Sequence, residues 1–212
     1  MNKRELDREL CRAFDKEDVE RAKQLIALGA DVNASGRWSG GCTMLWLTVN
    51  AAGQEISKNF RNLATGFAEY LPNVPQRNHA DKRQRYLRIM KMLIEAGADV
   101  NKPSNGSSPL WIAVHWRDLE VVRLLVANGA DPNAESYSVL SNLAKKKGRK
   151  TVPGYYNTAL HEAVEKNSVA IVKVLLDAGA DPKRTDHEGR TPLDIAHQKG
   201  YTRIVALLRN LI

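Results

Sequence analysis

The chain has 212 residues, 43% of them hydrophobic and 26% charged, and a formal net charge of +8. This is the composition of a globular protein, and no stretch approaches the roughly 18 apolar residues that a membrane-spanning helix needs. Its two cysteines, Cys11 and Cys42, are too few for a disulfide framework, and the N-terminal residues show no apolar core of a secretory signal. We therefore expect a protein of the reducing cytoplasm without membrane contact, although a nuclear location or non-classical export into a host cell stays open.

Two short motifs alternate along the chain. One is an apolar run opened by a hydroxyl residue, at Thr43, Ser108, Thr158 and Thr191, and such residues cap helix N-termini. The other places branched aliphatic residues at helical spacing before Gly-Ala-Asp, at residues 29–31, 97–99, 129–131 and 179–181. Glycine tolerates the positive φ that ends a helix and reverses the chain. The pattern predicts a series of short helix pairs.

These motifs resemble the Thr-Pro-Leu-His and Gly-Ala-Asp-Val-Asn patterns of ankyrin repeats. The resemblance implies an all-α fold, a solenoid of stacked helix-turn-helix units with hairpin-like fingers. We expect one ankyrin-repeat domain over residues 1–212. Its five parts are an N-terminal cap (about 1–36), a repeat with an insertion (about 37–102), a repeat (about 103–134), a repeat with an extended basic finger (about 135–184) and a C-terminal cap (about 185–212).

The chain departs from the family pattern at the helix-start histidine. In the family this residue ties neighbouring turns together by hydrogen bonds, and His161 is its counterpart here. Trp46, Trp111 and Asp194 stand at the equivalent positions of the other units. We expect the two tryptophans to replace the histidine by packing.

The longer insertion, roughly Ala52–Gln84, falls between the two helices of the second repeat unit, about 37–102. Residues 58–71 place apolar side chains on one helical stripe and predict an additional helix. Residues 72–84, which contain two prolines, predict a loop. The extra helix packs on the edge of the repeats in one interpretation and docks a partner in the other.

The shorter insertion, roughly Glu135–Val152, lengthens a finger. Its predicted tip carries five basic residues, Lys145, Lys146, Lys147, Arg149 and Lys150. Three interpretations stay open, namely a solvated loop, a contact for an acidic partner, and a nuclear address. The two insertions hold most of the positive charge but are expected at opposite ends of the helices, so they make no continuous basic stripe. Nucleic acid, or an acidic surface bound through Lys145–Lys150, is the alternative partner.

Candidate catalytic residues do not emerge from the sequence. The five histidines are scattered over different units, and none forms a pair at the spacing of metal ligands. Cys11 is expected in the core, and Cys42 on an exposed hairpin without an activating neighbour. We predict no enzyme, cofactor or metal site.

The resemblance to ankyrin repeats implies a scaffold, expected to be monomeric, that binds another protein on its concave face. Its contacts are expected at the finger tips and at the exposed ends of the first helices. Trp116 is the leading candidate because large aromatic residues often dominate interfaces, and its alternative is packing against its own repeat or against the long insertion. Trp38 and Tyr155 would continue an aromatic band. The candidate partner-binding residues are Trp38, Ser39, Asn50, Ser104, Asn105, Ser107, His115, Trp116, Tyr155, Asn157, Glu165, Lys166, His187, Glu188 and Arg190.

Overall fold

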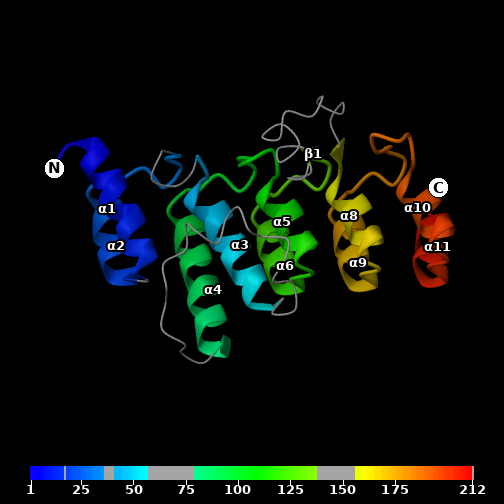
Figure 1. The fold of residues 1–212 in the computed structure, drawn as a ribbon, viewed down its shortest axis with the longest axis horizontal. Helices are drawn as coiled ribbons and strands as arrows, with labels where there is room; N and C mark the ends of the chain where they lie inside the picture. The colour runs from blue at the N-terminus through cyan, green and yellow to red at the C-terminus, as the bar shows by residue number, and fades with distance from the viewer. Residues whose placement is uncertain (17, 36–40, 57–78, 138–155, 212) are drawn as a thin grey trace, which may run out of the picture. The chain divides into compact units, whose positions relative to one another are not determined.

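The computed structural model describes residues 1–16, 18–35, 41–56, 79–137 and 156–211, and leaves out the side chains of residues 15, 54–56 and 79–82. The described chain is mostly helical and divides into two compact units, Met1–Asp99 and Val100–Ile212. Figure 1 labels the helices and strand β1 along the chain. The expected all-α fold of paired helices is confirmed within each unit.

The first unit consists of two helix pairs. Helix α1 (Lys3–Asp15) packs against α2 (Val19–Ala27), and α3 (Met44–Ile56) packs against α4 (His79–Glu95). The side chain of Asn2 accepts a hydrogen bond from the backbone of Glu5, whose carboxylate accepts one from the backbone of Asn2. This capping box starts α1 although the sequence there lacks the helix-start motif of the later pairs.

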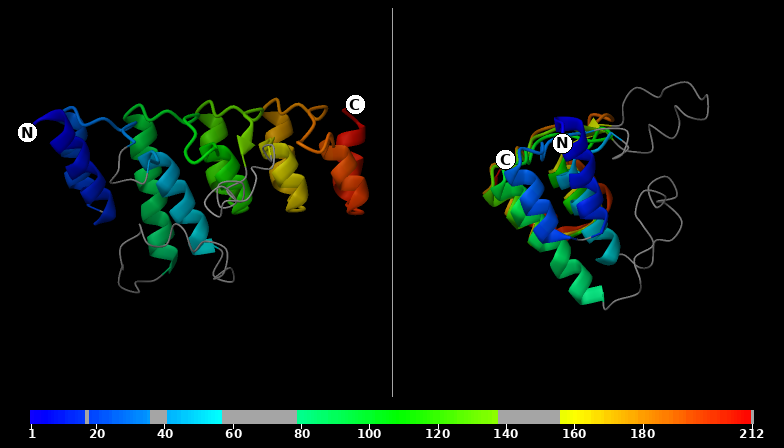
Figure 2. Two further views of the ribbon diagram at one scale, coloured as in Figure 1. Left: turned by 45° about the horizontal axis from the view of Figure 1, so that its top comes forward. Right: turned by 90° about the vertical axis from the view of Figure 1, so that its left-hand side faces the viewer.

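The second unit contains three helix pairs and one short hairpin. The pairs are α5 (Pro109–His115) with α6 (Leu119–Ala127), α8 (Ala159–Glu165) with α9 (Val169–Asp177), and α10 (Pro192–Gln198) with α11 (Thr202–Arg209). The first helices pack in the order α5, α8, α10, and the second helices in the order α6, α9, α11. This unit therefore has two layers of helices, which Figure 2 shows in two further views.

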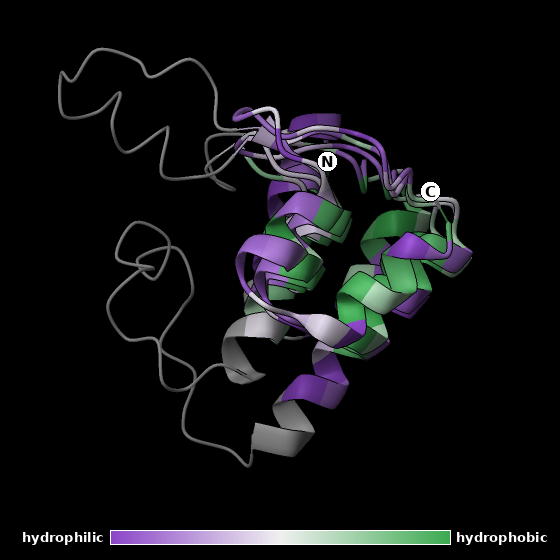
Figure 3. Ribbon diagram, turned by 90° about the vertical axis from the view of Figure 1, so that its right-hand side faces the viewer, coloured by the Kyte–Doolittle hydropathy of each residue, from purple (hydrophilic) through white to green (hydrophobic). Residues whose placement is uncertain are grey.

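Equivalent leucines hold the first helices in the core. Leu45, Leu110 and Leu160 are each the second residue of their helix, and each is almost completely buried. Leu193 has the same position in α10 but is half-buried. Burying one such side chain contributes roughly 1.5–3 kcal/mol. Hydrophobic residues lie mainly on the helices, whereas the loops that join the pairs are mainly hydrophilic (Figure 3).

Asparagine side chains connect one helix pair to the next. Asn133 donates from Nδ2 to the carbonyl oxygen of Gly179 at 2.9 Å and accepts at Oδ1 from the backbone N–H of Asp181 at 2.8 Å. Asn101 makes the same two contacts with Gly129 and Asp131. In the first unit Asn33 makes them with Gly97 and Asp99. Each of these asparagines thereby holds the Gly-Ala-Asp turn that follows it in the chain.

The long insertion lies between α3 and α4, as its spacing predicts, but both helices continue into it. Helix α3 has 13 residues and α4 has 17, whereas α5 has 7 and α6 has 9. The prediction of a loop over 72–84 is wrong from His79 onward, because α4 begins there. A helix that has already formed extends at little cost, even through polar residues. The helix expected over 58–71 lies outside the described residues.

The short insertion is flanked by a two-stranded hairpin. Strand β1 (Ser136–Tyr137) pairs antiparallel with β2 (Tyr156–Asn157), with Ser136 opposite Asn157. The predicted finger therefore has a hairpin at its base. Its basic tip lies outside the described residues.

Candidate functional site

The candidate site is formed by the C-terminal ends of the first helices in the second unit. We call residues 115–117, 165–167 and 198–200 the first-helix ends. Trp116, Lys166 and Lys199 are the C-caps of α5, α8 and α10, so they occupy equivalent positions in three consecutive pairs. A cation at a helix C-terminus is favoured by the helix dipole, which gives the two lysines a structural role. The same effect does not account for Trp116.

Glu162 is a buried carboxylate that contacts two residues of the first-helix ends. Its equivalents in α5 and α10 are Ile112 and Ile195, and all three side chains are buried. Oε1 of Glu162 lies 2.8 Å from Nδ1 of His115 and 3.4 Å from Nζ of Lys166. Burial alone raises the pKa of Glu162, but the hydrogen bond from His115 and the charges of His115 and Lys166 outweigh it, so the pKa lies below its ordinary value. Glu162 is therefore ionised at neutral pH.

His115 is held between two tryptophans. Its ring stacks on that of Trp111, with the ring centres 5.2 Å apart, and meets the ring of Trp116 edge-on at 5.3 Å. Trp111 is buried and donates from Nε1 to Oδ1 of Asn157 at 2.7 Å. The expectation that this tryptophan acts by packing was incomplete, since it also makes a hydrogen bond to Asn157, just before the next helix pair, α8 and α9. The three rings of Trp111, His115 and Trp116 therefore form a continuous contact from the buried core to the half-buried Trp116.

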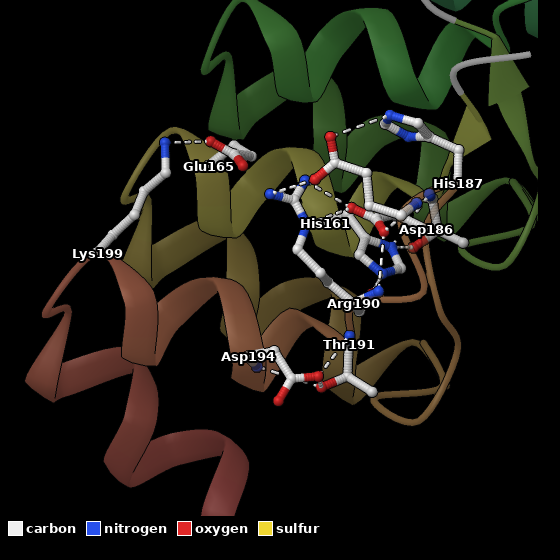
Figure 4. A network of polar contacts seen from close by, with 10 residues as sticks. His161, Glu165, Asp186, His187, Arg190, Thr191, Asp194 and Lys199 are labelled. Atoms are coloured by element: carbon white, nitrogen blue, oxygen red, sulfur yellow. Dashed lines mark hydrogen bonds and ion pairs between the residues drawn. The ribbon is translucent and has the colours of Figure 1, made fainter.

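Polar contacts link the first-helix ends across all three pairs. Arg117 donates from Nη2 to the backbone oxygen of Lys166 at 2.6 Å. Glu165 of α8 forms an ion pair with Lys199 at the end of α10 (Figure 4). The first-helix ends are therefore one connected surface of the second unit.

The finger side of this unit carries a second polar cluster. The buried carboxylate of Asp186 accepts hydrogen bonds from the backbone N–H groups of Glu188 and Arg190, both at 2.9 Å. Its Oδ2 also accepts from Nε and Nη2 of Arg190 at 3.0 and 2.7 Å (Figure 4). Burial opposes ionisation of Asp186, but these donors lower its pKa below the ordinary value. The cluster fixes the loop before α10 and turns Glu188 to its exterior, where that residue is exposed.

His161 joins the start of α8 to the loop that precedes α10. Its ring nitrogen Nδ1 lies 2.8 Å from Oγ1 of Thr158, and Nε2 lies 3.1 Å from the carbonyl oxygen of Arg190. The carbonyl can only accept, so Nε2 carries the proton and Nδ1 accepts from Thr158. Burial lowers the pKa of His161, and the neutral ring suits these partners. The structural role expected for this histidine agrees with its position.

Several residues expected at the surface are buried. Asn50 lies within α3, which continues past it to Ile56, and Ser104 and Ser107 pair with each other through their backbones beneath the finger. Cys42 is also buried, contrary to the expectation of an exposed hairpin thiol, because it directly precedes the buried cap Thr43. Asn50, Ser104 and Ser107 are therefore left out of the candidate surface.

The remaining candidates separate into two groups. His115, Trp116, Glu165 and Lys166 lie together at the first-helix ends, whereas Asn105, Asn157, His187, Glu188 and Arg190 lie on the finger side. Trp38, Ser39, Tyr155 and the basic residues Lys145, Lys146, Lys147, Arg149 and Lys150 lie outside the described residues.

Sequence reasoning missed the contributions of Trp111, Arg117 and Glu162. Comparing equivalent positions would have singled out Glu162, because its two counterparts are isoleucines. The partners of Trp111 and Arg117 are 46 and 49 residues away in the chain, so only the fold brings them together.

Within the described ranges, no group of three or more His, Cys, Asp or Glu residues is placed to hold a metal ion. The described helices also include none that is long and apolar enough to cross a membrane.

Comparison with known proteins establishes the family. Residues 79–136 and 135–211 match the family described as ankyrin repeats (3 copies). These matches cover more than half of the chain, which therefore belongs to the ankyrin-repeat family. Ankyrin repeats are in general protein–protein interaction modules, and the family is in general non-enzymatic.

Three relatives show how far the similarity extends. The chain is 26% identical over 221 residues to the ankyrin repeat protein YahD of Escherichia coli (strain K12), with 92% of each chain covered. It is 35% identical over 107 residues to BRCA1-associated RING domain protein 1 of Caenorhabditis elegans, covering 50% of this chain and 13% of that protein. It is 33% identical over 136 residues to the mouse nuclear factor NF-kappa-B p105 subunit, covering 62% and 12%. The chain thus spans less than a fifth of either longer relative.

Proposed function

We propose that this chain is a non-catalytic module that binds another protein through the first-helix ends of its second unit, with the finger side as a flanking contact. The observation that carries the proposal is the identity of residue 116. Trp116 occupies the C-cap position that Lys166 and Lys199 hold in the next two pairs. The indole of the half-buried Trp116 has no charge to complement the helix dipole there, whereas tryptophan is enriched among the residues that dominate binding energy at interfaces.

The surroundings of Trp116 support this role. His115 holds the ring edge-on, and His115 is itself held by Trp111 and Glu162. A side chain that is already ordered loses less conformational freedom when a partner binds, and this favours affinity.

The test compares Trp116→Ala with Leu124→Ala, which truncates a half-buried side chain on α6, the second helix of the same pair. Partners captured by the wild-type chain are identified, and their affinity is then measured with purified proteins. We expect Trp116→Ala to weaken binding by roughly 30-fold or more, which corresponds to about 2 kcal/mol, and Leu124→Ala to leave it nearly unchanged. Equal affinities of both variants, with circular dichroism like that of the wild type, would overturn the proposed surface.

A further inference from the structure

In the ion pairs of the first-helix ends, the cation is more exposed to solvent than the carboxylate. Glu162 pairs with Lys166, and the two side chains are 10% and 34% exposed. Glu165 pairs with Lys199, and the two side chains are 28% and 38% exposed. In each pair the carboxylate lies deeper than the cation. The surface that a partner would meet is therefore cationic.

In two ion pairs of the finger side, the carboxylate is more exposed to solvent than the cation. Glu188 is 51% exposed, whereas its partner Arg190 is 30% exposed. Glu135 is likewise 51% exposed, against 42% for Arg184. In these two pairs the carboxylate is the more exposed partner, although Arg190 also pairs with Asp186, whose side chain is only 3% exposed.

An exposed arginine and a half-buried tryptophan adjoin these cations. Arg117 directly follows Trp116 and lies against the end of α8 through its bond to the backbone oxygen of Lys166. An arginine fork and two ammonium groups match carboxylates, and an indole ring offers an apolar contact beside them.

We infer that the first-helix ends bind an acidic segment of a partner protein. An apolar side chain of that segment packs on Trp116, and its carboxylates face Arg117, Lys166 and Lys199. This inference rests on the proposed function and adds the chemical class of the partner.

The dimensions of the surface define the segment. Packed helices lie about 8–10 Å apart, so α5 to α10 covers roughly 20 Å across two steps. An extended peptide crosses this distance in about six residues. An extended segment of this length with one apolar residue and a few carboxylates fits the surface.

The balance of charges favours a peptide over nucleic acid. Two carboxylates, Glu162 and Glu165, lie beneath the cations Arg117, Lys166 and Lys199, so the surface has a small positive excess. Nucleic-acid binding depends on many cations that each neutralise a phosphate of the charged backbone. This surface has too few cations for that. A few carboxylates, each opposite one cation, suit it better.

The experiment uses the full chain and a fluorescein-labelled octapeptide with one leucine and four glutamates, next to an analogue with glutamine in place of glutamate. Fluorescence anisotropy measures affinity, and amide chemical shifts locate the bound peptide. We expect the glutamate peptide to bind at least tenfold more tightly than its analogue and to shift residues 115–117, 165–167 and 198–200.

Matched charge reversals test the location. Arg117→Glu and Lys199→Glu change the proposed surface, whereas Arg123→Glu and Lys173→Glu make the same change at exposed positions of the second helices α6 and α9. We expect the first two to weaken binding of the glutamate peptide at least tenfold, and the other two to change it less than twofold.

Several outcomes would overturn the inference. The inference fails if the glutamate peptide does not bind, if it binds no more tightly than its glutamine analogue, or if both pairs of variants weaken its binding equally. It also fails if a single-stranded oligonucleotide of the same charge binds more tightly than the glutamate peptide and depends equally on Arg117 and Lys199. The comparison of Trp116→Ala with Leu124→Ala measures partner binding separately. A partner that is lost on Trp116→Ala while the glutamate peptide fails to bind would leave the proposed function intact and remove the acidic class.

Discussion

Glu162 is a charged residue at a position where the neighbouring pairs have isoleucine. Removing one partner from a buried ion pair commonly destabilises a protein, whereas replacing the pair by well-packed apolar residues is often neutral or stabilising. The side chains that pair with Glu162 are themselves about a third exposed, so they reach solvent without it. Stability alone therefore does not explain why a carboxylate stands here.

Replacing Glu162 tests whether the carboxylate serves stability or binding. Because the pKa of Glu162 in the folded chain lies below its ordinary value of 4.5, its stabilising contribution is present above pH 4.5 and is lost as the pH falls through the lower folded value. Urea unfolding should show Glu162→Gln less stable than wild type by roughly 1–3 kcal/mol at pH 7, with a difference that shrinks below pH 4.5.

Glu162→Ile is the matched control, since it reproduces Ile112 and Ile195. We expect it to be as stable as the wild type at pH 7 while weakening partner binding, because His115 then loses its anchor. Unchanged partner binding, or a Glu162→Gln difference that grows toward acid pH, would contradict this role.

At the scale of single helices, the sequence predicts where pairs begin and end. Hydroxyl caps precede α5 and α10, and positive-φ glycines at 129 and 179 end the second helices, as local chemistry requires. The lengths of α3 and α4 did not follow from the sequence. Residues 79–84 are polar and lack helical periodicity, so their helical state depends on the turn of α4 that they extend.

The candidate site was predictable to a smaller degree. Family position alone indicated Trp116 and Lys166, because equivalent ends of equivalent helices lie in one row. Burial of Ser107 was not predictable, because its hydroxyl donates to the carbonyl oxygen of Tyr137 in β1, which lies 30 residues further along the chain. Contacts between distant residues are the part of the site that sequence periodicity does not encode.

Helix α9 offers a test of capping within one fold. Asp118 caps α6 by accepting at Oδ1 from the backbone of Val121 at 3.2 Å, whereas Ser168, with a similar backbone conformation, makes no side-chain cap hydrogen bond to α9. Ser168→Asp should add this bond and a negative charge at the helix N-terminus, and so stabilise the chain by roughly 0.5–1 kcal/mol. Thermal unfolding measures the change, with Ser168→Ala as control. A variant with aspartate that is no more stable than the one with alanine would contradict the prediction.

At the scale of the whole molecule, stability depends on how each helix pair is joined to its neighbours. A repeat protein is held together by the intrinsic stability of each unit and by the interfaces between adjacent units. Within the second unit the interfaces combine apolar packing with the paired contacts of Asn101 and Asn133. The sequence shows these asparagines as turn residues, and the structure shows that they also join successive turns.

Asn133→Ala should weaken the join between the α5/α6 and α8/α9 pairs. The variant loses the bonds to Gly179 and Asp181, and because this region is exposed to water the cost should be about 1 kcal/mol. Native-state hydrogen exchange is the measurement, since it resolves local opening. We expect faster exchange at Ala180 and Asp181 and in α8 and α9 than in α5 and α6. Lys183→Ala, at the equivalent position after α9, is the control, and an equal effect of both substitutions would show that the asparagine does not couple the pairs.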